Sequence, residues 1–421
     1  MIIPKLTKKI PNPIKKIIYH FLAQNYIKKI NTEIDKNKKT ILILNHFFDQ
    51  DIAALLKENK DYNLVVINAP MLFKGARFYF SKGVQDINIP YLSEPENNRF
   101  YYNKECQCIF DALNYRFNIK LIVTASDMFY WVREFINVAH DNRVNTVILD
   151  KEGLISPSHF KSESERKRKF TPLISDHIYV WSERQVEFWQ ESGVNKKNIT
   201  VIGQPRSDNF FRKKTYKVDK MFDVPQPLIT FFTYEDTAYI PISLVREENL
   251  SWKGMKEETQ DHLYQLAKVH PEYNFIFKAH PQQTDLESIQ SKYTLPNLRV
   301  VGGSDIANEL IIRSELIIAF QTTAIIEAMF MEKNVIYTAW DDTINFISEE
   351  IIPYHQAQGI VIAKSFDLFK KVCKDFFEGD QSDFNFSTTE IKEKHEMVSQ
   401  YLYKPDGHVA ERFFNEIKKL F

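Results

Sequence analysis

The chain has 421 residues, 44% hydrophobic and 26% charged, a composition typical of a globular protein of about two domains. Its 55 basic and 55 acidic side chains cancel, which excludes an overall field that favours nucleic acid. Three cysteines are too few for a disulfide framework and lack the spacing of a structural zinc site, so we expect reduced thiols and a cytoplasmic protein. No apolar run reaches the roughly 18 residues of a membrane span, and the basic start lacks the features of a signal peptide.

The first thirty residues contain lysine but no acidic residue. Asn12 and Pro13 are typical of a helix start, and apolar residues recur behind them at helical spacing as far as Ile27. We therefore predict a basic amphipathic helix within residues 1–35. Such a helix can lie on an anionic membrane face, or it can pack on the protein with its lysines solvated. Both interpretations remain open.

From residue 40 onward, short β-rich runs alternate with amphipathic helical segments. The predicted strands before residue 224 are Thr40–Leu44, Leu64–Asn68, Asp86–Pro90, Lys120–Thr124, Asn145–Leu149, His177–Trp181 and Thr200–Gly203. Those after the prolines at 225 and 227 are Leu228–Thr233, Asn274–Lys278, Leu298–Val301, Glu315–Ala319 and Asn334–Thr338. This alternation predicts two Rossmann-like α/β domains with parallel sheets, 36–224 and 225–395, followed by helices in 396–421.

Four polar clusters follow predicted strands, where parallel α/β sheets collect their ligands. Thr322 and Thr323 follow the strand that ends at Ala319 and begin a predicted helix, so their hydroxyls and amides can meet a phosphate. Glu327 lies one turn further and can reach a ribose diol. The alternative is a threonine that only caps the helix, with an exposed Glu327.

The strand that ends at Lys278 is followed by His280 and Pro281. A cationic or hydrogen-bonding pair at a strand end suits a diphosphate, although a histidine there can also be purely structural.

Asp150 and Glu152 flank Lys151 after a third strand, and Gly153 permits a tight turn. One of these carboxylates can act as a general base, or the segment is an ordinary acidic turn. The fourth cluster contains Arg206, which can pair with Asp208 to shape the site or can meet a phosphate.

Together these clusters resemble bacterial surface carbohydrate biosynthesis proteins of the GT-B type. CDP-glycerol polyol-phosphate transferases and CMP-sugar transferases are similar in the order of their motifs. The matching segments are Leu149–Gly153, Val180–Ser182 with Gln185, Ile202–Asp208, Lys278–Pro281, Thr322–Thr323 with Glu327, and Asp406–Arg412. Here Lys151 interrupts the acidic pair, and Gln321-Thr322-Thr323 replaces the Asp-Tyr-Ser-Ser of the polyol transferases.

The resemblance implies a GT-B fold, in which two Rossmann-like domains face a cleft and a C-terminal helix crosses back to the first domain. It implies an acceptor-binding domain at 36–224, a nucleotide-donor domain at 225–395 and a crossover helix in 396–421. The implied activity is transfer of a sugar from a CMP-, CDP- or UDP-linked donor onto a capsule, lipopolysaccharide or teichoic-acid-like acceptor. The implied place is the cytoplasm, with contact to the inner membrane face left open. No Asp-x-Asp motif follows a likely donor strand, and helix amides can stabilise a leaving phosphate, so we expect no metal and no cofactor.

The resemblance also assigns roles to residues. It maps Glu152 to the catalytic base, with Asp150 as the fallback. It maps His280, with Lys278 and Pro281 beside it, to the donor nucleotide or its phosphate. It maps Thr322 and Thr323 to phosphate and Glu327 to ribose. His46 and Asp49, which follow the first strand of the α/β region, are secondary candidates for acceptor binding or for the base.

Other functions remain open beside the glycosyltransferase. A polyol-phosphate transferase using CDP-glycerol or CDP-ribitol would attack phosphorus and leave a phosphodiester in its product. A nucleotide-sugar 2-epimerase would need no acceptor. A non-catalytic partner of the polysaccharide assembly machinery would bind without turnover.

Overall fold

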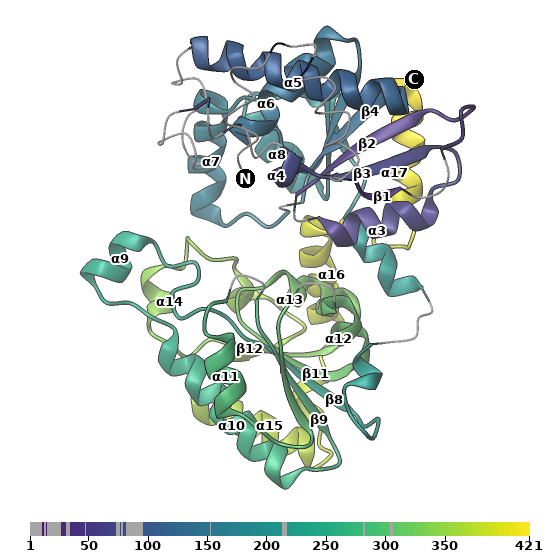
Figure 1. Ribbon diagram of the computed structural model, residues 1–421. Helices are drawn as coiled ribbons and strands as arrows, with labels where there is room; N and C mark the ends of the chain where they lie inside the picture. Colours follow the sequence, from purple (N-terminus) through teal and green to yellow (C-terminus); the bar gives the residue numbers. More distant parts are fainter. Residues whose placement is uncertain are drawn as a thin grey trace. The chain divides into compact units, whose positions relative to one another are not determined.

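The computed structural model describes Pro11, Ile14 and residues 27–30, 34–46, 48–72, 76, 79–80, 96–151, 153–212, 217–280, 283–303 and 306–421. The chain forms two compact units. Unit 1 comprises Met1–Gly153, Lys161–Asp208 and Tyr403–Phe421, and unit 2 comprises Leu154–Phe160 and Asn209–Leu402. Each unit is built on one sheet flanked by helices (Figure 1).

The sheet of unit 1 has the order β1-β3-β2-β4-β5-β6-β7. Its strands are β1 (Ile27–Ile30), β2 (Thr40–Asn45), β3 (Asn63–Asn68), β4 (Ile119–Thr124), β5 (Asn145–Leu149), β6 (His177–Val180) and β7 (Ile199–Val201). All neighbours pair in parallel except β1, which runs antiparallel to β3 at the sheet edge. Because parallel strands need crossovers, helices cover both faces of this sheet.

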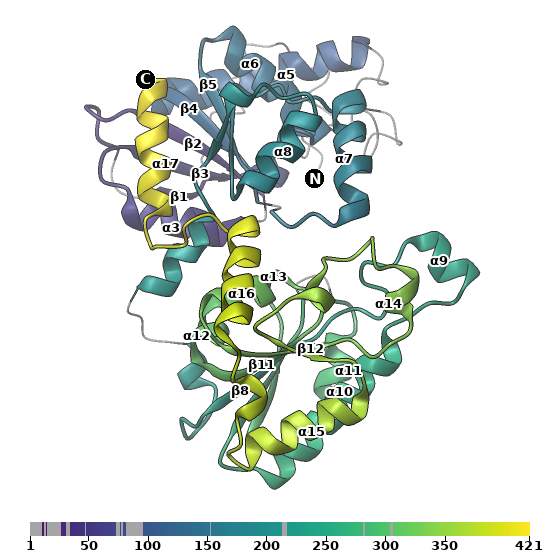
Figure 2. The same cartoon turned by 180° about the vertical axis from the view of Figure 1, so that it is seen from behind.

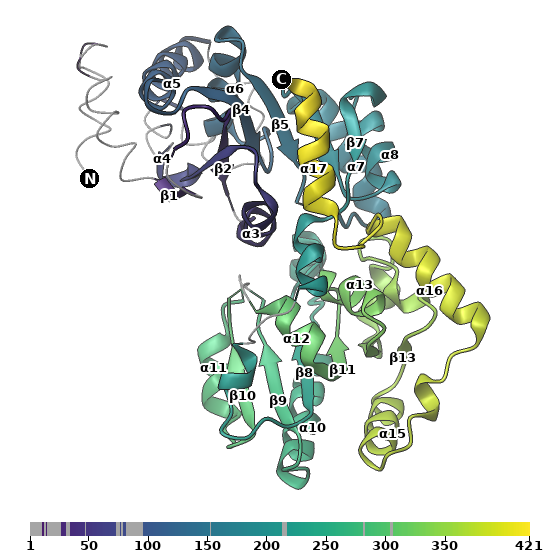
Figure 3. The same cartoon turned by 90° about the vertical axis from the view of Figure 1, so that its right-hand side faces the viewer.

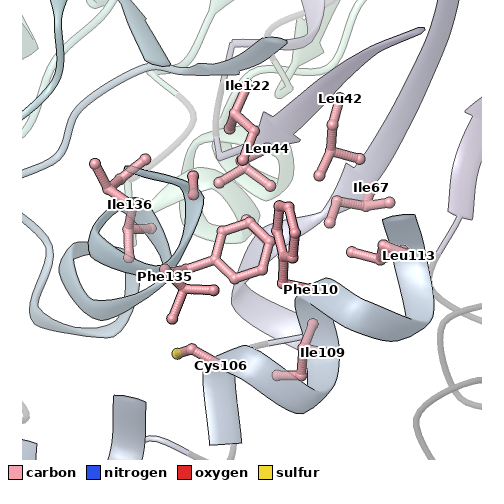
Figure 4. Close-up of a cluster of buried hydrophobic side chains, with 14 of the residues drawn as sticks. Leu42, Leu44, Ile67, Cys106, Ile109, Phe110, Leu113, Ile122, Phe135 and Ile136 are labelled. Atoms are coloured by element: carbon pink, nitrogen blue, oxygen red, sulfur yellow. The ribbon is translucent and has the colours of Figure 1, made fainter. Parts of the chain in front are cut away.

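Alternate residues of the unit 1 strands face opposite sides of the sheet and enter separate cores. Leu42 and Leu44 of β2 pack with helices α5 (Glu96–Phe117) and α6 (Tyr130–Asp141), as Figure 4 shows. Ile41 and Ile43 point the other way, into the core that also contains Ile52 of α3 (Asp49–Glu58). The remaining helices of this part of the chain are α4 (Ala69–Leu72), α7 (Pro157–Phe170) and α8 (Glu183–Glu191).

The end of the chain returns to unit 1 as helix α17 (Val409–Ile417). Its Ala410, Phe413 and Ile417 are buried in the same core as Ile41 and Ile43, on the face of the sheet that α3 also covers (Figure 2). The three positions lie on one face of a helix, which is the spacing that burial against a sheet requires. The predicted crossover helix is thereby confirmed.

The sheet of unit 2 has six parallel strands in the order β10-β9-β8-β11-β12-β13, and Figure 3 shows β10, β9, β8 and β11 side by side. They are β8 (Leu228–Phe232), β9 (Asn274–Lys278), β10 (Leu298–Val301), β11 (Ser314–Ala319), β12 (Asn334–Thr338) and β13 (Val361–Ala363). The helices are α9 (Ile242–Glu247), α10 (Lys253–Val269), α11 (Leu286–Lys292), α12 (Ala307–Arg313), α13 (Thr323–Phe330), α14 (Thr343–Phe346), α15 (Phe366–Phe377) and α16 (Thr388–Tyr401).

The predicted fold class, two Rossmann-like sheets with a returning final helix, is confirmed. Eleven predicted strands appear within a residue or two of their expected bounds. The strand predicted over Asp86–Pro90 lies outside the described residues. The three-residue β13 carries too short a pattern to have been predicted. Ile27 was placed on a helical face but lies in β1, where the open edge of β3 offers hydrogen bonds that a four-residue segment can use.

Candidate functional site

The topology of unit 2 places a switch point between β8 and β11. From β8 the chain builds β9 and β10 on one side, and it then starts β11 on the other side. Crossovers therefore leave in opposite directions at the carboxyl ends of these two neighbouring strands, which is where open α/β sheets bind ligands. The predicted donor residues follow β9 and β11, so the fold brings them to this edge of unit 2.

The chain leaves β11 through a turn that ends at the N-terminus of α13. Gln321 has a left-handed φ of 44°, and Thr322 returns to an extended backbone and caps the helix by accepting a hydrogen bond from the Ala324 N–H at 3.3 Å. The first amides of a helix lack intrahelical acceptors and carry partial positive charge. Thr322 is half-buried and Thr323 is exposed, so this turn can present N–H and hydroxyl groups to a phosphate.

The side-chain amide of Gln321 holds this turn in place. Its Nε2 donates to the Tyr337 hydroxyl and to the Ile352 carbonyl, both at 2.8 Å, and its Oε1 accepts from the Ile352 N–H at 2.9 Å. The Tyr354 hydroxyl donates to the Thr322 carbonyl at 3.2 Å. A left-handed backbone conformation is costly for a residue with a Cβ, so it persists only where neighbouring groups hold it. Here the hydrogen bonds of the Gln321 side chain hold it.

Glu327 lies on α13 and is buried, with 4% of its surface exposed. The alternative of an exposed Glu327 is therefore wrong, whereas the capping role of Thr322 is present. Burial raises the pKa of the Tyr354 phenol, and the carboxylate of Glu327 is among the neighbouring groups that add to this.

The β9 edge carries Lys278 and His280. Lys278 is buried, and its ammonium donates to the Ala279 carbonyl at the end of its own strand. His280 is exposed, and its backbone N–H donates to Oε1 of Gln283 at 3.1 Å. His280 is thus an exposed residue whose own backbone N–H is held by a neighbouring side chain. Pro281 lies outside the described residues.

In unit 1, His46 and Asp49 follow β2. The His46 ring contacts Phe129 and Trp131 edge-on, with ring centroids 4.6 and 5.1 Å apart. Burial and the charge of Lys151 lower the pKa of His46 to about 4, so its imidazole is neutral at pH 7. The Asp49 carboxylate accepts a hydrogen bond from the Asn45 amide at 2.9 Å.

Asp150 holds helix α8 against the end of β5. Its Oδ2 accepts hydrogen bonds from Nε2 of Gln185 at 3.1 Å and from the indole N–H of Trp189 at 2.9 Å. The side chain is buried and these two donors occupy the same carboxylate oxygen. Asp150 therefore connects β5 to α8. Glu152, the first candidate for the base, lies outside the described residues.

Gly153 is a glycine because the ring of Trp181 occupies the space of its side chain. A Cβ at this position would lie 1.8 Å from Cε3 of that ring. The Arg206 guanidinium lies over the same ring, 4.8 Å from its centroid. Gly203 has a φ of 95°, and a Cβ there would lie 2.6 Å from the Tyr403 carbonyl. Both glycine motifs therefore serve close packing in unit 1.

The predicted pairing of Arg206 with Asp208 is wrong. Arg206 pairs instead with Asp51 of α3, through its backbone N–H at 3.0 Å and its guanidinium at 3.7 Å. Burial raises the pKa of the Asp51 carboxyl, and Arg206 opposes this shift. Asp208 caps α17 instead. The physical reason is that Pro205–Phe211 form a 3-10 helix with about three residues per turn, so residues two apart face different elements.

Sequence patterns gave no individual role to several residues that shape these two sheet edges. Asp51, Trp181, Gln283 and Gln321 all contact predicted site residues or their loops. Two of them carried a sequence signal, because Trp181 lies within the matching segment Val180–Ser182 and Gln321 directly precedes the threonine pair. Among the described residues, no group of three or more His, Cys, Asp and Glu side chains is arranged to hold a metal ion. Within that same part of the chain, no helix is both long and apolar enough to cross a membrane.

Two doubly wound α/β units, with the last helix returned to the first unit, define a fold of the GT-B type. No protein-family model matches the chain, and no curated protein matches its sequence. Solved structures do share its fold. S. aureus MnaA, in a structure with UDP, is 12% identical with a TM-score of 0.53, over 91% of this chain and 96% of that chain.

Two further solved structures share the fold, one of a 2-epimerase and one of a teichoic acid polymerase. The UDP-GlcNAc 2-epimerase from Methanocaldococcus jannaschii is 13% identical with a TM-score of 0.52, over 91% of this chain and 99% of that chain. The wall teichoic acid polymerase TagF, in a structure with CDPG, is 9% identical with a TM-score of 0.53, over 97% of this chain and 93% of that chain. At such identities the similarity shows the fold alone.

Proposed function

We propose that this chain is a glycosyltransferase that moves a sugar from a nucleotide-activated donor onto a cell-surface polysaccharide acceptor. The observation that carries the proposal is the turn from β11 into α13 at the switch point of unit 2, with Thr322 at the helix cap and Glu327 one turn behind it. Proteins of the same fold have been solved with UDP and with CDPG, which supports a nucleotide-linked donor here.

The donor diphosphate is proposed to meet Thr322, Thr323 and the imidazole of His280, and the ribose is proposed to meet Glu327. An exposed imidazole and an exposed helix N-terminus can both hydrogen-bond phosphate oxygens, and the helix N-terminus also attracts negative charge. Lys278 contributes positive charge at the same sheet edge, although its ammonium is occupied by the Ala279 carbonyl. No metal and no cofactor are part of this proposal.

The acceptor is proposed to bind unit 1 at the carboxyl edge of its sheet. Glu152 is the proposed base, and His46 and Asp49 are proposed to bind the acceptor or to replace Glu152. The neutral His46 supports a role as hydrogen-bond partner of a sugar hydroxyl. The engagement of Asp150 with Gln185 and Trp189 argues against its use as the fallback base. The proposed setting is the cytoplasm, and contact with the inner face of the cytoplasmic membrane is tested separately below.

Two other activities are proposed as alternatives because proteins of the same fold include a UDP-GlcNAc 2-epimerase and a wall teichoic acid polymerase solved with CDPG. A polyol-phosphate transferase would act on CDP-glycerol or CDP-ribitol. A nucleotide-sugar 2-epimerase would convert its substrate without any acceptor.

The test begins with calorimetric binding of CMP, CDP, UDP and GDP to the full chain. Sugar- and polyol-linked forms of the tightest-binding nucleotide are then incubated with and without a polysaccharide acceptor. Acceptor-dependent release of the nucleotide with a new glycosidic bond supports the proposal, and a new phosphodiester identifies the polyol transferase. Conversion of the sugar without acceptor identifies the epimerase. A protein that binds none of the four nucleotides would refute all three enzymatic functions.

A further inference from the structure

A buried lysine joins the two loops that follow β8 and β9 in unit 2. The Lys256 side chain, on α10, is 4% exposed, and its ammonium contacts Asp236 in the first loop and Oδ2 of Asp285, at 2.7 Å, in the second. Both carboxylates are partly exposed. Burial lowers the pKa of Lys256, but the hydrogen bonds that its ammonium donates to the two carboxylates outweigh burial and leave the pKa raised, so the ammonium stays charged.

Asp285 connects Lys256 to Gln283, because it accepts a hydrogen bond from each of them. The Oδ1 atom of Asp285 accepts a hydrogen bond from Nε2 of Gln283 at 2.7 Å, while Oδ2 is held by Lys256. The same Nε2 also approaches the Thr233 hydroxyl, at 3.4 Å. Gln283 is 9% exposed. Because its Nε2 faces these two oxygens, its Oε1 points the other way, and only this orientation of the amide lets both atoms form hydrogen bonds.

The other end of the Gln283 amide reaches His280. Its Oε1 accepts the His280 N–H at 3.1 Å, and the Gln283 backbone N–H donates to the His280 carbonyl at 2.9 Å. The peptide groups on either side of the His280 α-carbon are therefore both bonded to Gln283. The backbone of the exposed His280 is therefore held by a hydrogen-bond network that runs through Gln283 and Asp285 to the buried ammonium of Lys256 on α10.

We propose that Gln283, anchored through Asp285 by Lys256, is a positioning residue that holds His280 in the orientation that receives the phosphate of a nucleotide. The inference rests on the donor site of the proposed function. A fixed loop has less conformational freedom to lose when the ligand binds, so the network raises affinity without touching the ligand.

Unit 2 provides a matched control for this network. Gln260 of α10 is 2% exposed and donates to the same Thr233 hydroxyl, at 3.1 Å, and among the described residues it makes no hydrogen bond to those that follow β9. Gln260→Leu and Gln283→Leu both remove a buried amide next to Thr233. A purely structural role predicts similar effects of the two changes, whereas a positioning role predicts that only Gln283→Leu alters ligand binding.

The experiment measures calorimetric affinity for whichever of CMP, CDP, UDP and GDP binds the full chain most tightly, with melting temperatures to confirm folding. We expect Gln283→Leu to weaken binding about tenfold, a coupling usual within one hydrogen-bonded network. Lys256→Met should weaken it in the same direction, and Gln260→Leu should leave it unchanged. In a His280→Ala background, Gln283→Leu should cause no further loss.

Wild-type affinity in both Gln283→Leu and Lys256→Met overturns the inference, as does equal weakening by Gln283→Leu with and without His280. If Gln283→Leu does not fold, Lys256→Met tested with and without His280 decides the question by itself. An unaltered affinity in His280→Ala removes His280 from the donor site, and this inference with it, whereas the site itself falls only if Thr322→Ala/Thr323→Ala also binds normally. A weakened His280→Ala beside unaltered Gln283→Leu and Lys256→Met refutes the positioning network alone.

Discussion

Asp208 accepts hydrogen bonds from the backbone N–H groups of Val409 and Ala410, at 2.9 and 2.8 Å, although these partners lie some two hundred residues further along the chain. Asp208 is fully buried, and its two oxygens meet the first amides of α17. A carboxylate at a helix N-terminus satisfies amides that have no intrahelical acceptor and interacts favourably with the helix dipole. The last helix is therefore attached to unit 1 by a specific cap as well as by its apolar face.

Removing this charge should loosen α17. We expect Asp208→Asn to lower the free energy of unfolding by about 1–2 kcal/mol, the usual scale of a helix cap. Urea denaturation of the full chain measures it. Asp342→Asn is the control, because Asp342 begins α14 without a side-chain cap bond. Equal loss in the two variants would contradict the capping role of Asp208.

The proposed donor site predicts a selective loss of nucleotide affinity. His280→Ala should weaken binding of the tightest nucleotide by about 1–3 kcal/mol, the usual cost of one hydrogen bond to a charged group. The double change Thr322→Ala/Thr323→Ala should also weaken it. Calorimetry measures both, and His395→Ala, an exposed histidine on α16, should bind as the wild type does. Unchanged affinity in both test variants would place the nucleotide elsewhere.

The catalytic proposal predicts different consequences for two neighbouring carboxylates. Glu152→Gln should preserve nucleotide affinity and lower kcat by about 10²–10⁴, as expected for loss of a general base. Asp150→Asn should instead lower stability by about 1–3 kcal/mol, because a buried carboxylate oxygen that serves two donors is disturbed. Steady-state kinetics and urea denaturation separate the two effects. Normal turnover in Glu152→Gln would move the proposed base to His46 or Asp49.

The lowered pKa of His46 predicts a pH dependence of stability. Between about pH 6.5 and the folded pKa of about 4, His46 is protonated in the unfolded state but neutral in the folded state. The free energy of unfolding therefore decreases as pH falls through this range. In His46→Gln this contribution is absent. Urea denaturation at pH 7 and pH 4.5 should show a smaller decrease for the variant. The same decrease in both proteins would show that His46 is not held neutral.

The lysine-rich start of the chain predicts binding to anionic vesicles. Ile27–Ile30 form β1, so the appropriate deletion removes residues 1–26 and keeps this strand. The full chain should co-sediment with anionic liposomes at low salt, and the deletion should abolish this. Added salt should weaken the binding, because the attraction is screened. A full chain that ignores anionic liposomes at low salt would refute membrane contact. A deletion that unfolds would favour a segment packed on the protein.

The fold was largely predictable because its signals are local. Apolar strands such as Asn145–Leu149 and Asn274–Lys278 appear with the expected bounds, since a short apolar run between helical segments encodes a buried parallel strand wherever it lies. Strand β1 was not predictable in this way. Its state depends on the free edge of β3, which no property of residues 27–30 reveals.

Local patterns placed the candidate site residues at strand ends but did not identify their partners. His280 and Thr322 lie at one sheet edge of unit 2, as the order of strands and helices implies. Arg206 is bonded to Asp51, 155 residues away, and Asp150 is bonded to residues of α8. Such pairings depend on which elements become neighbours in the folded protein.

The sequence by itself determined most strands of the two sheets and the strand ends at which the candidate polar residues lie, because hydrophobic periodicity and turn residues act within a few positions of the chain. The return of the last helix was implied by the family resemblance alone. Only the tertiary structure decided that Asp150 is bonded to α8 and Asp208 to α17, that Glu327 is buried, and that Gln283 and Gln321 are bonded to the candidate donor turns. The physical reason is that a polar side chain is assigned its role by burial and by its hydrogen-bond partners, and both are set by contacts between distant segments.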